Sequence, residues 1–487
     1  MNEIYKLTAS EIREKIANRE LTAVEVTEAV FERIEKKDEL INSFVSLRKE
    51  AALHEAKIID EKIARGEKVG VLAGVPVSIK DNMVSTGDLT TACSKILGNY
   101  TGIYDATVVK KLKEADAVII GKTNMDEFAM GGTTRTSSHG LTKNPWDTTK
   151  VPGGSSGGAA TSIAAQECFI SLGSDTGGSI RQPSSFCGVV GLKPTYGRVS
   201  RYGLIAFASS LDQIGPIAKS VEDVALTMNV IAGTDEYDAT VSKKEVPDYT
   251  KALGRDIKGM KIGVPKEYFI EGIDEGVRKV MLESLDKLRE LGAEIVDISL
   301  PHTKYAVPVY YVLAPAEASS NLARFDGVRY GYRSPEAKNI LDLYVKSRTE
   351  GFGAEVKRRI MIGTYVLSAG FFHAYFKKAQ KVRALIKKDF DEAFKTVDVI
   401  FTPVAPSPAF ELNKEKTPIE LYLEDIFTLS ANLAGIPGLS VPAGLTNRLP
   451  VGIQLLGKQF GEEDLIAVGS AFEKIRGEWK LPEGEDK

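Results

Sequence analysis

The sequence has few cysteines and no long apolar run. Its 487 residues include three cysteines, Cys93, Cys168 and Cys187, which are too few and too scattered for a disulfide framework, and no Cys/His spacing is typical of a metal site. Nowhere do about 18 apolar residues follow one another, and the N-terminus carries charges where a signal peptide would be apolar. We therefore expect reduced and mostly buried cysteines, no metal, no membrane contact and a cytoplasmic location.

The chain also has no excess of charge of either sign. Lys and Arg together number 63, and Asp and Glu number 66, which gives a formal net charge of −3. This balance provides no general attraction to nucleic acid or to an anionic membrane, so any contact with RNA has to be local. With 43% hydrophobic and 26% charged residues, the composition is typical of a globular protein and excludes a disordered or fibrous one.

The order of expected helices and strands indicates an α/β protein. Thr8-x-x-Glu11 and Thr22-x-x-Glu25 have the pattern of capping boxes, which predicts two amphipathic helices in an N-terminal helical layer at residues 1–70. No linker or repeat divides the chain, and residues from about 300 to 395 are expected to be mostly helical, so we predict one large domain. Short runs rich in β-branched residues predict strands at 75–79, 117–120, 261–264, 294–298, 397–401 and 451–455.

Glycine and serine are concentrated between Gly131 and Gly215. The sequence GGSSGG at 153–158 continues directly into an alanine-rich helical pattern, and a second turn, DTGGS at 175–179, follows an apolar run. Loops of this kind place backbone N–H groups and hydroxyls around a reacting carbonyl, although two ordinary structural turns are the alternative. A nucleotide site is disfavoured, because the first loop has no Walker lysine and no GxGxxG lies between a strand and a helix.

A general base for a serine nucleophile is hard to find among the histidines. The chain has four, and only His139 lies near the glycine loops in the sequence. Lys80 is a different candidate, because it ends the apolar strand pattern VPVSIK at 75–80. The ordinary interpretation of such a lysine is that it emerges into solvent where the strand ends.

Residues 153–200, together with VPVSIKDN at 75–82, resemble the signature of the amidase signature family. The resemblance implies a signature core at 71–230 and a mixed central β-sheet covered by helices on both faces. It also implies that Ser179 is the nucleophile and that Lys80 is the base. Ser155, which is expected to follow a cis peptide bond, would bridge the two. Ser156 is a competing choice for the bridging serine. The expected oxyanion hole consists of the backbone amides of Thr176, Gly177, Gly178 and Ser179.

Three further segments, at 126–154, 315–333 and 355–372, are similar to the glutamine-hydrolysing subunits of tRNA-dependent amidotransferases within this family. That likeness implies ammonia transfer to Glu-tRNA(Gln), Asp-tRNA(Asn) or both, a heterotrimer with B and C subunits, and contact with aminoacyl-tRNA through the B subunit. No cofactor is expected on this chain, and ATP and magnesium are expected at the B subunit. The implied glutamine-binding residues are Gly131, Gly132, Tyr310, Arg359 and Asp425, with Arg358 and Tyr311 as neighbouring alternatives.

The expected mechanism requires an unusual lysine. At the reference pKa, only about one lysine in 2,500 is neutral at pH 7, which is too few for an efficient base. Burial disfavours the charged amine and lowers a lysine pKa by about 3 units or more, so we predict that Lys80 is neutral in the resting protein. There are two alternative functions. One is a free-standing amidase acting on small amides, and the other is a catalytically silent scaffold that binds tRNA or a partner.

Overall fold

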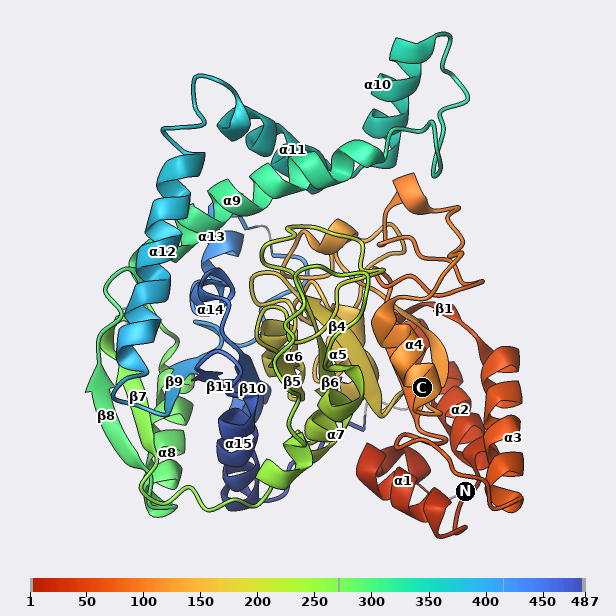
Figure 1. Cartoon of the computed structure of the whole chain (residues 1–487), viewed down its shortest axis with the longest axis vertical. Coiled ribbons are helices and arrows are strands. Elements are labelled where there is room, and N and C mark those ends of the chain that lie inside the picture. The colour runs from red at the N-terminus through yellow and green to blue at the C-terminus, as the bar shows by residue number, and fades with distance from the viewer. Residues whose placement is uncertain (1–2, 270–271, 415, 484–487) are drawn as a thin grey trace.

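One mixed β-sheet runs through the computed structural model, which describes residues 3–269, 272–414 and 416–483 (Figure 1). The sheet has 11 strands, and the strand pairs β2–β3, β2–β4, β7–β8 and β7–β9 are parallel while the others are antiparallel. Its order is β1-β3-β2-β4-β6-β5-β10-β11-β9-β7-β8. The strands are β1 Phe44–Leu47, β2 Pro76–Lys80, β3 Val118–Thr123, β4 Ile170–Asp175, β5 Val190–Lys193, β6 Gln213–Ala218, β7 Lys261–Pro265, β8 Glu294–Ile298, β9 Val399–Pro403, β10 Gly438–Thr446 and β11 Leu449–Gly457.

Helices surround this sheet along the whole chain. They are α1 Ala9–Ala17, α2 Ala23–Ile41, α3 Lys49–Ala64, α4 Thr107–Glu114, α5 Gly157–Ala164, α6 Arg181–Cys187, α7 Val221–Ile231, α8 Glu275–Glu290, α9 Ala306–Asn321, α10 Ile340–Gly351, α11 Ala354–Leu367, α12 Phe376–Ala393, α13 Pro418–Leu423, α14 Leu429–Ala434 and α15 Glu462–Arg476. Among the described residues, no helix combines the length and the apolarity that a bilayer crossing needs.

The two faces of β10 show that helices cover both sides of the sheet. Successive side chains of a strand point to opposite faces. A Cβ atom on Gly452 would meet Ser440 of β10 and Ser185 of α6, whereas Gly469 of α15 lies against Leu439. Helices α6 and α15 therefore lie on opposite faces, and the predicted α/β architecture is confirmed.

Local signals in the sequence identified most of the regular structure near the N-terminus and in the sheet. Both predicted capping boxes, at Thr8 and Thr22, are present and start α1 and α2. Each of the six predicted strand runs coincides with a strand to within a few residues, and the region from 300 to 395 contains α9 to α12. The three cysteines are buried free thiols, as predicted.

Five strands, β1, β4, β5, β6 and β10, were not among the predicted strand runs. Strand β10 contains Pro442, which lacks a backbone N–H, and its pairing with β11 shifts register between Pro442 and Gly444. Strand β6 contains Gly215 and Pro216. A proline or glycine inside a run argues against a central strand, and here the tertiary pairing overrides that local preference.

Strands β2 and β4 bring the two segments that carry most of the predicted chemistry to one edge of the sheet. They are parallel neighbours, with Ile79 opposite Leu172. Their carboxyl ends therefore lie side by side, which places Lys80 next to the turn that follows Asp175. Helices α9, α10 and α11 form the upper part of the molecule in the view of Figure 1, and α12 runs down its left side.

Candidate active site

Lys80 is the last residue of β2 and is completely buried. Its Nζ lies 2.7 Å from Ser155 Oγ, 2.8 Å from Ser156 Oγ and 2.9 Å from Ser174 Oγ. The first two serines belong to the glycine-rich loop that leads into α5, and the peptide bond between Gly154 and Ser155 is cis. The amine is therefore enclosed by hydroxyl groups and does not reach solvent, unlike an ordinary lysine at the end of a strand.

Burial changes the acidity of this amine. Desolvation lowers the pKa of Lys80 from 10.5 to about 7, even though the negative charges of Asp126 and Asp175 favour its protonated form. At pH 7 about half of the molecules then have a neutral amine. The direction agrees with the predicted neutral lysine, so the site contains an amine that is partly neutral near pH 7.

Ser179 is on the second glycine loop, between β4 and α6. Its backbone carbonyl accepts a hydrogen bond of 3.2 Å from Ser156 N–H, so the two glycine loops lie against each other. Ser155 is 0% exposed and Ser179 is 7% exposed, so solvent reaches the site from the side of Ser179. The structure thus brings Lys80, Ser155 and Ser179 into one place from three separate segments.

A buried ion pair holds the second glycine loop. The Asp175 carboxylate accepts hydrogen bonds from Gly178 N–H at 2.8 Å and Ile180 N–H at 3.1 Å, and it pairs with Arg181 Nε at 3.1 Å. Burial alone would raise the pKa of Asp175, but the charge of Arg181 holds it well below its usual value. The carboxylate therefore stays ionised and fixes the conformation of the loop.

Gly177 and Gly178 let two neighbouring side chains, those of Tyr310 and Thr428, approach the backbone of this loop more closely than a residue with a side chain would permit. A Cβ on Gly178, whose φ is +131°, would collide with Thr428 Oγ1, and a Cβ on Gly177 would lie 2.8 Å from Tyr310 Cζ. Thr428 Oγ1 also donates to the Gly177 carbonyl at 2.6 Å. Of the amides expected in the oxyanion hole, that of Gly178 already donates to Asp175, so it would have to share this partner when an oxyanion binds.

The residues expected to bind glutamine lie around these loops. The Gly131–Gly132 turn lies next to Asp425, whose carboxylate oxygens are 3.8 and 3.9 Å from the position of a Cβ on Gly132. Burial and the charge of Glu424 raise the pKa of Asp425 well above its usual value. A substrate ammonium next to this carboxylate would favour its ionised form.

The structure distinguishes two of the predicted pocket residues, Arg359 and Tyr310, from their sequence neighbours Arg358 and Tyr311. Arg359 is 4% exposed, whereas Arg358 is exposed and pairs with Glu355 on the surface of α11. Tyr310 touches Gly177, whereas Tyr311 stacks on another ring, and its own ring lies 5.5 Å from the guanidinium of Arg359. Tyr310 is thus the tyrosine that lies against the second glycine loop, and Tyr311 is the one that packs near Arg359.

The guanidinium of Arg359 is held in place but only partly engaged. Its Nε pairs with Glu355 Oε1 at 2.8 Å, and its central carbon lies 5.5 Å from the ring of Phe207 and 5.8 Å from that of Tyr422. In the described part of the chain its hydrogen bonds involve Nε alone. The two terminal nitrogens are therefore available for a bidentate contact with a carboxylate.

A cluster of potential metal ligands near Lys80 was not evident from the sequence. Ligand atoms of Asp81, Cys93 and His139 lie within 4.8 Å of one another. Thr91 Oγ1 donates to Asp81 and lies 3.1 Å from His139 Nε2, and Cys93 Sγ is 3.7 Å from the same carboxylate. Because these atoms already satisfy one another, we interpret the cluster as a hydrogen-bonded support of the turn after β2. The residues are too far apart in the sequence to form a recognisable motif.

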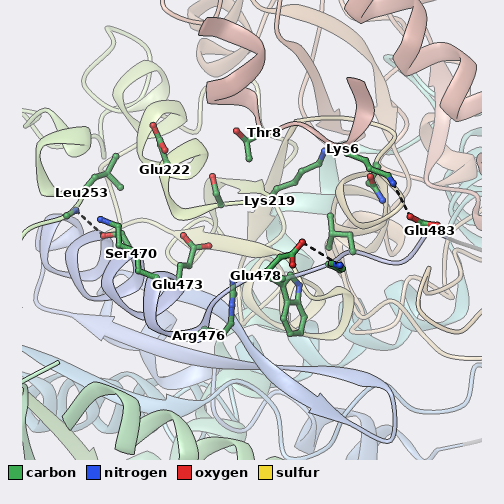
Figure 2. A pocket seen from close by; sticks show the side chains of 17 residues that line it. Lys6, Thr8, Lys219, Glu222, Leu253, Ser470, Glu473, Arg476, Glu478 and Glu483 are labelled. Atoms are coloured by element: carbon green, nitrogen blue, oxygen red, sulfur yellow. Dashed lines mark hydrogen bonds and ion pairs between the residues drawn. The ribbon is translucent and has the colours of Figure 1, made fainter. Parts of the chain in front are cut away.

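A cavity of about 810 Å³ lies away from this site, where the N-terminal segment meets α7 and α15 (Figure 2). Its charged groups hold chain segments together: Lys219 Nζ donates to the carbonyls of Tyr5 and Leu7, and Glu473 accepts from Val221 N–H. Its lining includes none of the residues predicted to take part in catalysis or in glutamine binding. The cavity therefore belongs to a structural junction, and the residues predicted to be catalytic lie elsewhere, at the carboxyl ends of β2 and β4.

Known proteins resemble this chain over nearly its whole length. The family model described as Amidase matches residues 25–466. The A subunit of the glutamyl-tRNA(Gln) amidotransferase from Fusobacterium nucleatum is 69% identical over 99% of both chains. The crystal structure of the corresponding protein from Thermotoga maritima, which has the same name, has a TM-score of 0.82 at 44% identity and covers 100% of this chain and 99% of that chain. A bacterial aryl acylamidase of the amidase signature family has a TM-score of 0.86 at 26% identity and covers 97% of each chain. The chain belongs to the amidase family.

Proposed function

We propose that this protein is the glutamine-hydrolysing subunit of a tRNA-dependent amidotransferase. The observation that carries the proposal is the contact of 2.7 Å between the buried Lys80 amine and Ser155, beside the glycine loop that contains Ser179. Support for the particular reaction comes from the 69% identity with the A subunit of a glutamyl-tRNA(Gln) amidotransferase. The arrangement provides a nucleophile, a base that is available near neutral pH and backbone amides for a developing oxyanion.

In the proposed mechanism the neutral Lys80 amine takes a proton from Ser155, which takes one from Ser179. The Ser179 oxygen attacks the carboxamide carbon of glutamine and forms a tetrahedral oxyanion, which the amides at 176–179 stabilise. The proton returns by the same route to the leaving nitrogen, so ammonia departs and a glutamyl ester remains on Ser179. Water then attacks this ester, with Lys80 again as the base, and glutamate is released.

Hydrogen-bond counting favours Ser155 over Ser156 as the bridge. The Ser156 hydroxyl donates to the Ser174 carbonyl at 3.0 Å and accepts from Ser174 N–H at 3.2 Å, so it is committed to holding α5 against β4. Within the described residues the one hydrogen bond of the Ser155 hydroxyl is that with Lys80. Ser155 therefore keeps a hydroxyl proton that it can pass on, and we propose that it is the relay.

Arg359 and Asp425 are proposed to orient the glutamine. The terminal nitrogens of Arg359 would hold the α-carboxylate, and Asp425, beside Gly132, would hold the α-ammonium. Tyr310 would limit the pocket next to Gly177. A substrate held at both α groups presents its carboxamide to Ser179 in a defined position.

The rate of glutamine hydrolysis is expected to rise with pH and to be half-maximal near pH 7. The cause is the Lys80 amine, whose pKa is about 7 and which accepts a proton only when neutral, so kcat/KM should fall about tenfold per pH unit well below 7. The titratable groups that act on it are Asp126, Asp175, Cys93 and Asp212, and burial raises the pKa of Asp212 to about 6. The profile is measured from pH 5.5 to 9 at constant ionic strength. A rate that does not change over this range would contradict the role of Lys80.

The proposed function includes partner subunits and a second reaction. The ammonia would pass to a B subunit that amidates Glu-tRNA(Gln), Asp-tRNA(Asn) or both, at the cost of ATP and with magnesium, while a C subunit completes the heterotrimer. This reaction belongs to protein synthesis, so the proposed location is the cytoplasm.

Transfer of labelled nitrogen tests this function directly. Glutamine carrying ¹⁵N in its side-chain amide is supplied to the full chain together with B and C subunits, ATP, magnesium and charged tRNA. We expect the label to appear in the amide of Gln-tRNA or Asn-tRNA and glutamine hydrolysis to increase when charged tRNA is present. If labelled ammonia appears in solution but never in the tRNA-bound amide, the protein is a free-standing amidase. If no glutamine is hydrolysed, the proposed function is wrong.

A further inference from the structure

Glu127 is a buried carboxylate to which the mechanism above gives no role. It is 3% exposed and begins the short helical turn Glu127–Ala129, which follows β3. Its Oε2 accepts from Gly353 N–H at 2.9 Å, its Oε1 accepts from the same N–H at 3.1 Å, and Ser94 Oγ donates to Oε1. Gly353 is the N-cap residue of α11 and has no side chain to cap it. Glu127 therefore caps α11 from a distant part of the chain, where an acidic group also complements the helix dipole.

The start of α11 is fitted closely to this segment. A Cβ on Gly353 would collide with the Glu127 carboxylate, so any other residue there would displace this carboxylate from its present position. The ring of Phe128 packs edge-on against that of Phe352 at a centroid distance of 5.6 Å. Ser94 Oγ also lies 3.3 Å from the Gly351 carbonyl. The three residues before α11 are thus all held: Gly353 and Phe352 contact the segment of Glu127, and Gly351 contacts Ser94, the hydrogen-bond partner of Glu127.

Arg359 lies on α11 between the contact of Gly353 with Glu127 and a second contact, which Gly363 makes with α9. It is six residues after Gly353, which corresponds to about 9 Å along the helix axis. Four residues further on, a Cβ on Gly363 would collide with the Pro315 carbonyl of α9, so the helix backbone is pressed against its neighbour there. The position of the guanidinium therefore depends on both contacts, and Glu127 provides the one at the start of the helix.

The residue before Glu127 is connected to the reacting groups. Asp126 N–H donates to the Ser155 carbonyl at 3.2 Å. Its carboxylate accepts from Thr133 N–H at 3.1 Å and Thr134 N–H at 2.8 Å, which shapes the turn that includes Gly132. Two adjacent residues thus join the serine relay on one side to the helix of Arg359 on the other.

We propose that Glu127 is a positioning residue that sets the place of the Arg359 guanidinium relative to the serine relay, and that it thereby determines selectivity for substrates with an α-carboxylate. The inference rests on the proposed function, because it assigns the α-carboxylate of glutamine to Arg359. The reach of the Glu127 side chain is the important property, since the carboxylate has to meet Gly353 N–H across the gap between two segments.

Three variants of the full chain, in complex with the B and C subunits, separate reach from charge. Glu127→Gln keeps the length and an acceptor oxygen, Glu127→Asp keeps the charge but is one methylene shorter, and Glu127→Ala loses both. Because the helix that carries Arg359 loses the contact at its N-terminus, KM for glutamine should rise about 10-fold in Glu127→Ala, with kcat within about threefold. Glu127→Asp should resemble Glu127→Ala, and Glu127→Gln should stay within about threefold of the wild type.

The second measurement is the rate at which a small alkyl fluorophosphonate labels Ser179, which needs no α-carboxylate. This rate should stay within about threefold of the wild type in all variants that retain the circular dichroism and thermal unfolding of the wild type. The proposal is overturned if labelling and glutamine hydrolysis fall together, if KM is unchanged in Glu127→Asp and Glu127→Ala, or if Glu127→Gln is as impaired as Glu127→Asp. A wild-type complex that is labelled at Ser179 but does not hydrolyse glutamine would instead disprove the proposed function.

Discussion

Lys80→Met should lower kcat for glutamine hydrolysis by about 10³-fold, since general base catalysis contributes about 10²–10⁴-fold. Methionine fills the buried volume but has no lone pair on nitrogen with which to take the proton of Ser155. The amine is completely buried and contacts three serine hydroxyls, none of which is basic enough to replace it. Steady-state ammonia release, measured with a coupled glutamate dehydrogenase assay corrected for product glutamate, gives the rate.

A second buried lysine provides the matched control. Lys122 is on the neighbouring strand β3, is 0% exposed and donates to the Met83 carbonyl and to Thr90 Oγ1, and burial lowers its pKa to about 8. Lys122→Met removes an equally buried amine that contacts no serine of the relay. We expect Lys122→Met to lower the melting temperature but to keep kcat within about threefold. If Lys80→Met kept more than about a tenth of wild-type kcat, or if both variants lost activity equally, Lys80 would not be the base.

Ser179→Ala should have the largest effect of all, a loss of roughly 10⁵-fold or more in kcat, because no covalent intermediate can form. The wild-type protein should react with a fluorophosphonate, in which the Ser179 oxygen bonds to phosphorus and fluoride leaves. Mass spectrometry of the digested protein would place the adduct on the peptide that contains Ser179. In Ser179→Ala both the adduct and glutamine hydrolysis should be absent.

Ser184→Ala is the control for this experiment. Ser184 is in α6, the helix that follows Ser179. It is fully buried and donates through Oγ to the Ile180 carbonyl at 2.7 Å. The variant loses a hydroxyl of the same kind from the same region, so its labelling and kcat should stay within about threefold of the wild type. An adduct on Ser155, or continued labelling of Ser179→Ala, would show that another serine is the nucleophile.

The parts of this fold that depend on local signals could be predicted from the sequence. The capping boxes at Thr8 and Thr22 determine where α1 and α2 begin, because each box satisfies N–H groups within one helical turn. The glycine loops before α5 and α6 were evident for a similar reason, since residues such as Gly178 adopt a backbone conformation that other residues avoid. Strands β6 and β10 were missed because each contains a proline, which argues locally against a central strand, although β10 forms a hairpin with the next strand, β11.

The sequence was enough to predict the fold class and, through its resemblance to a family signature, to propose the lysine and the two serines, with Ser156 as an alternative for the bridge. The surroundings of these side chains depend on the tertiary structure. The depressed pKa of Lys80 arises from its complete burial, and the commitment of Ser156 to Ser174 depends on how α5 lies against β4. The contact between Glu127 and Gly353 joins residues 226 positions apart. Desolvation and hydrogen bonding act between groups that the sheet brings together, and no local sequence pattern records which groups these are.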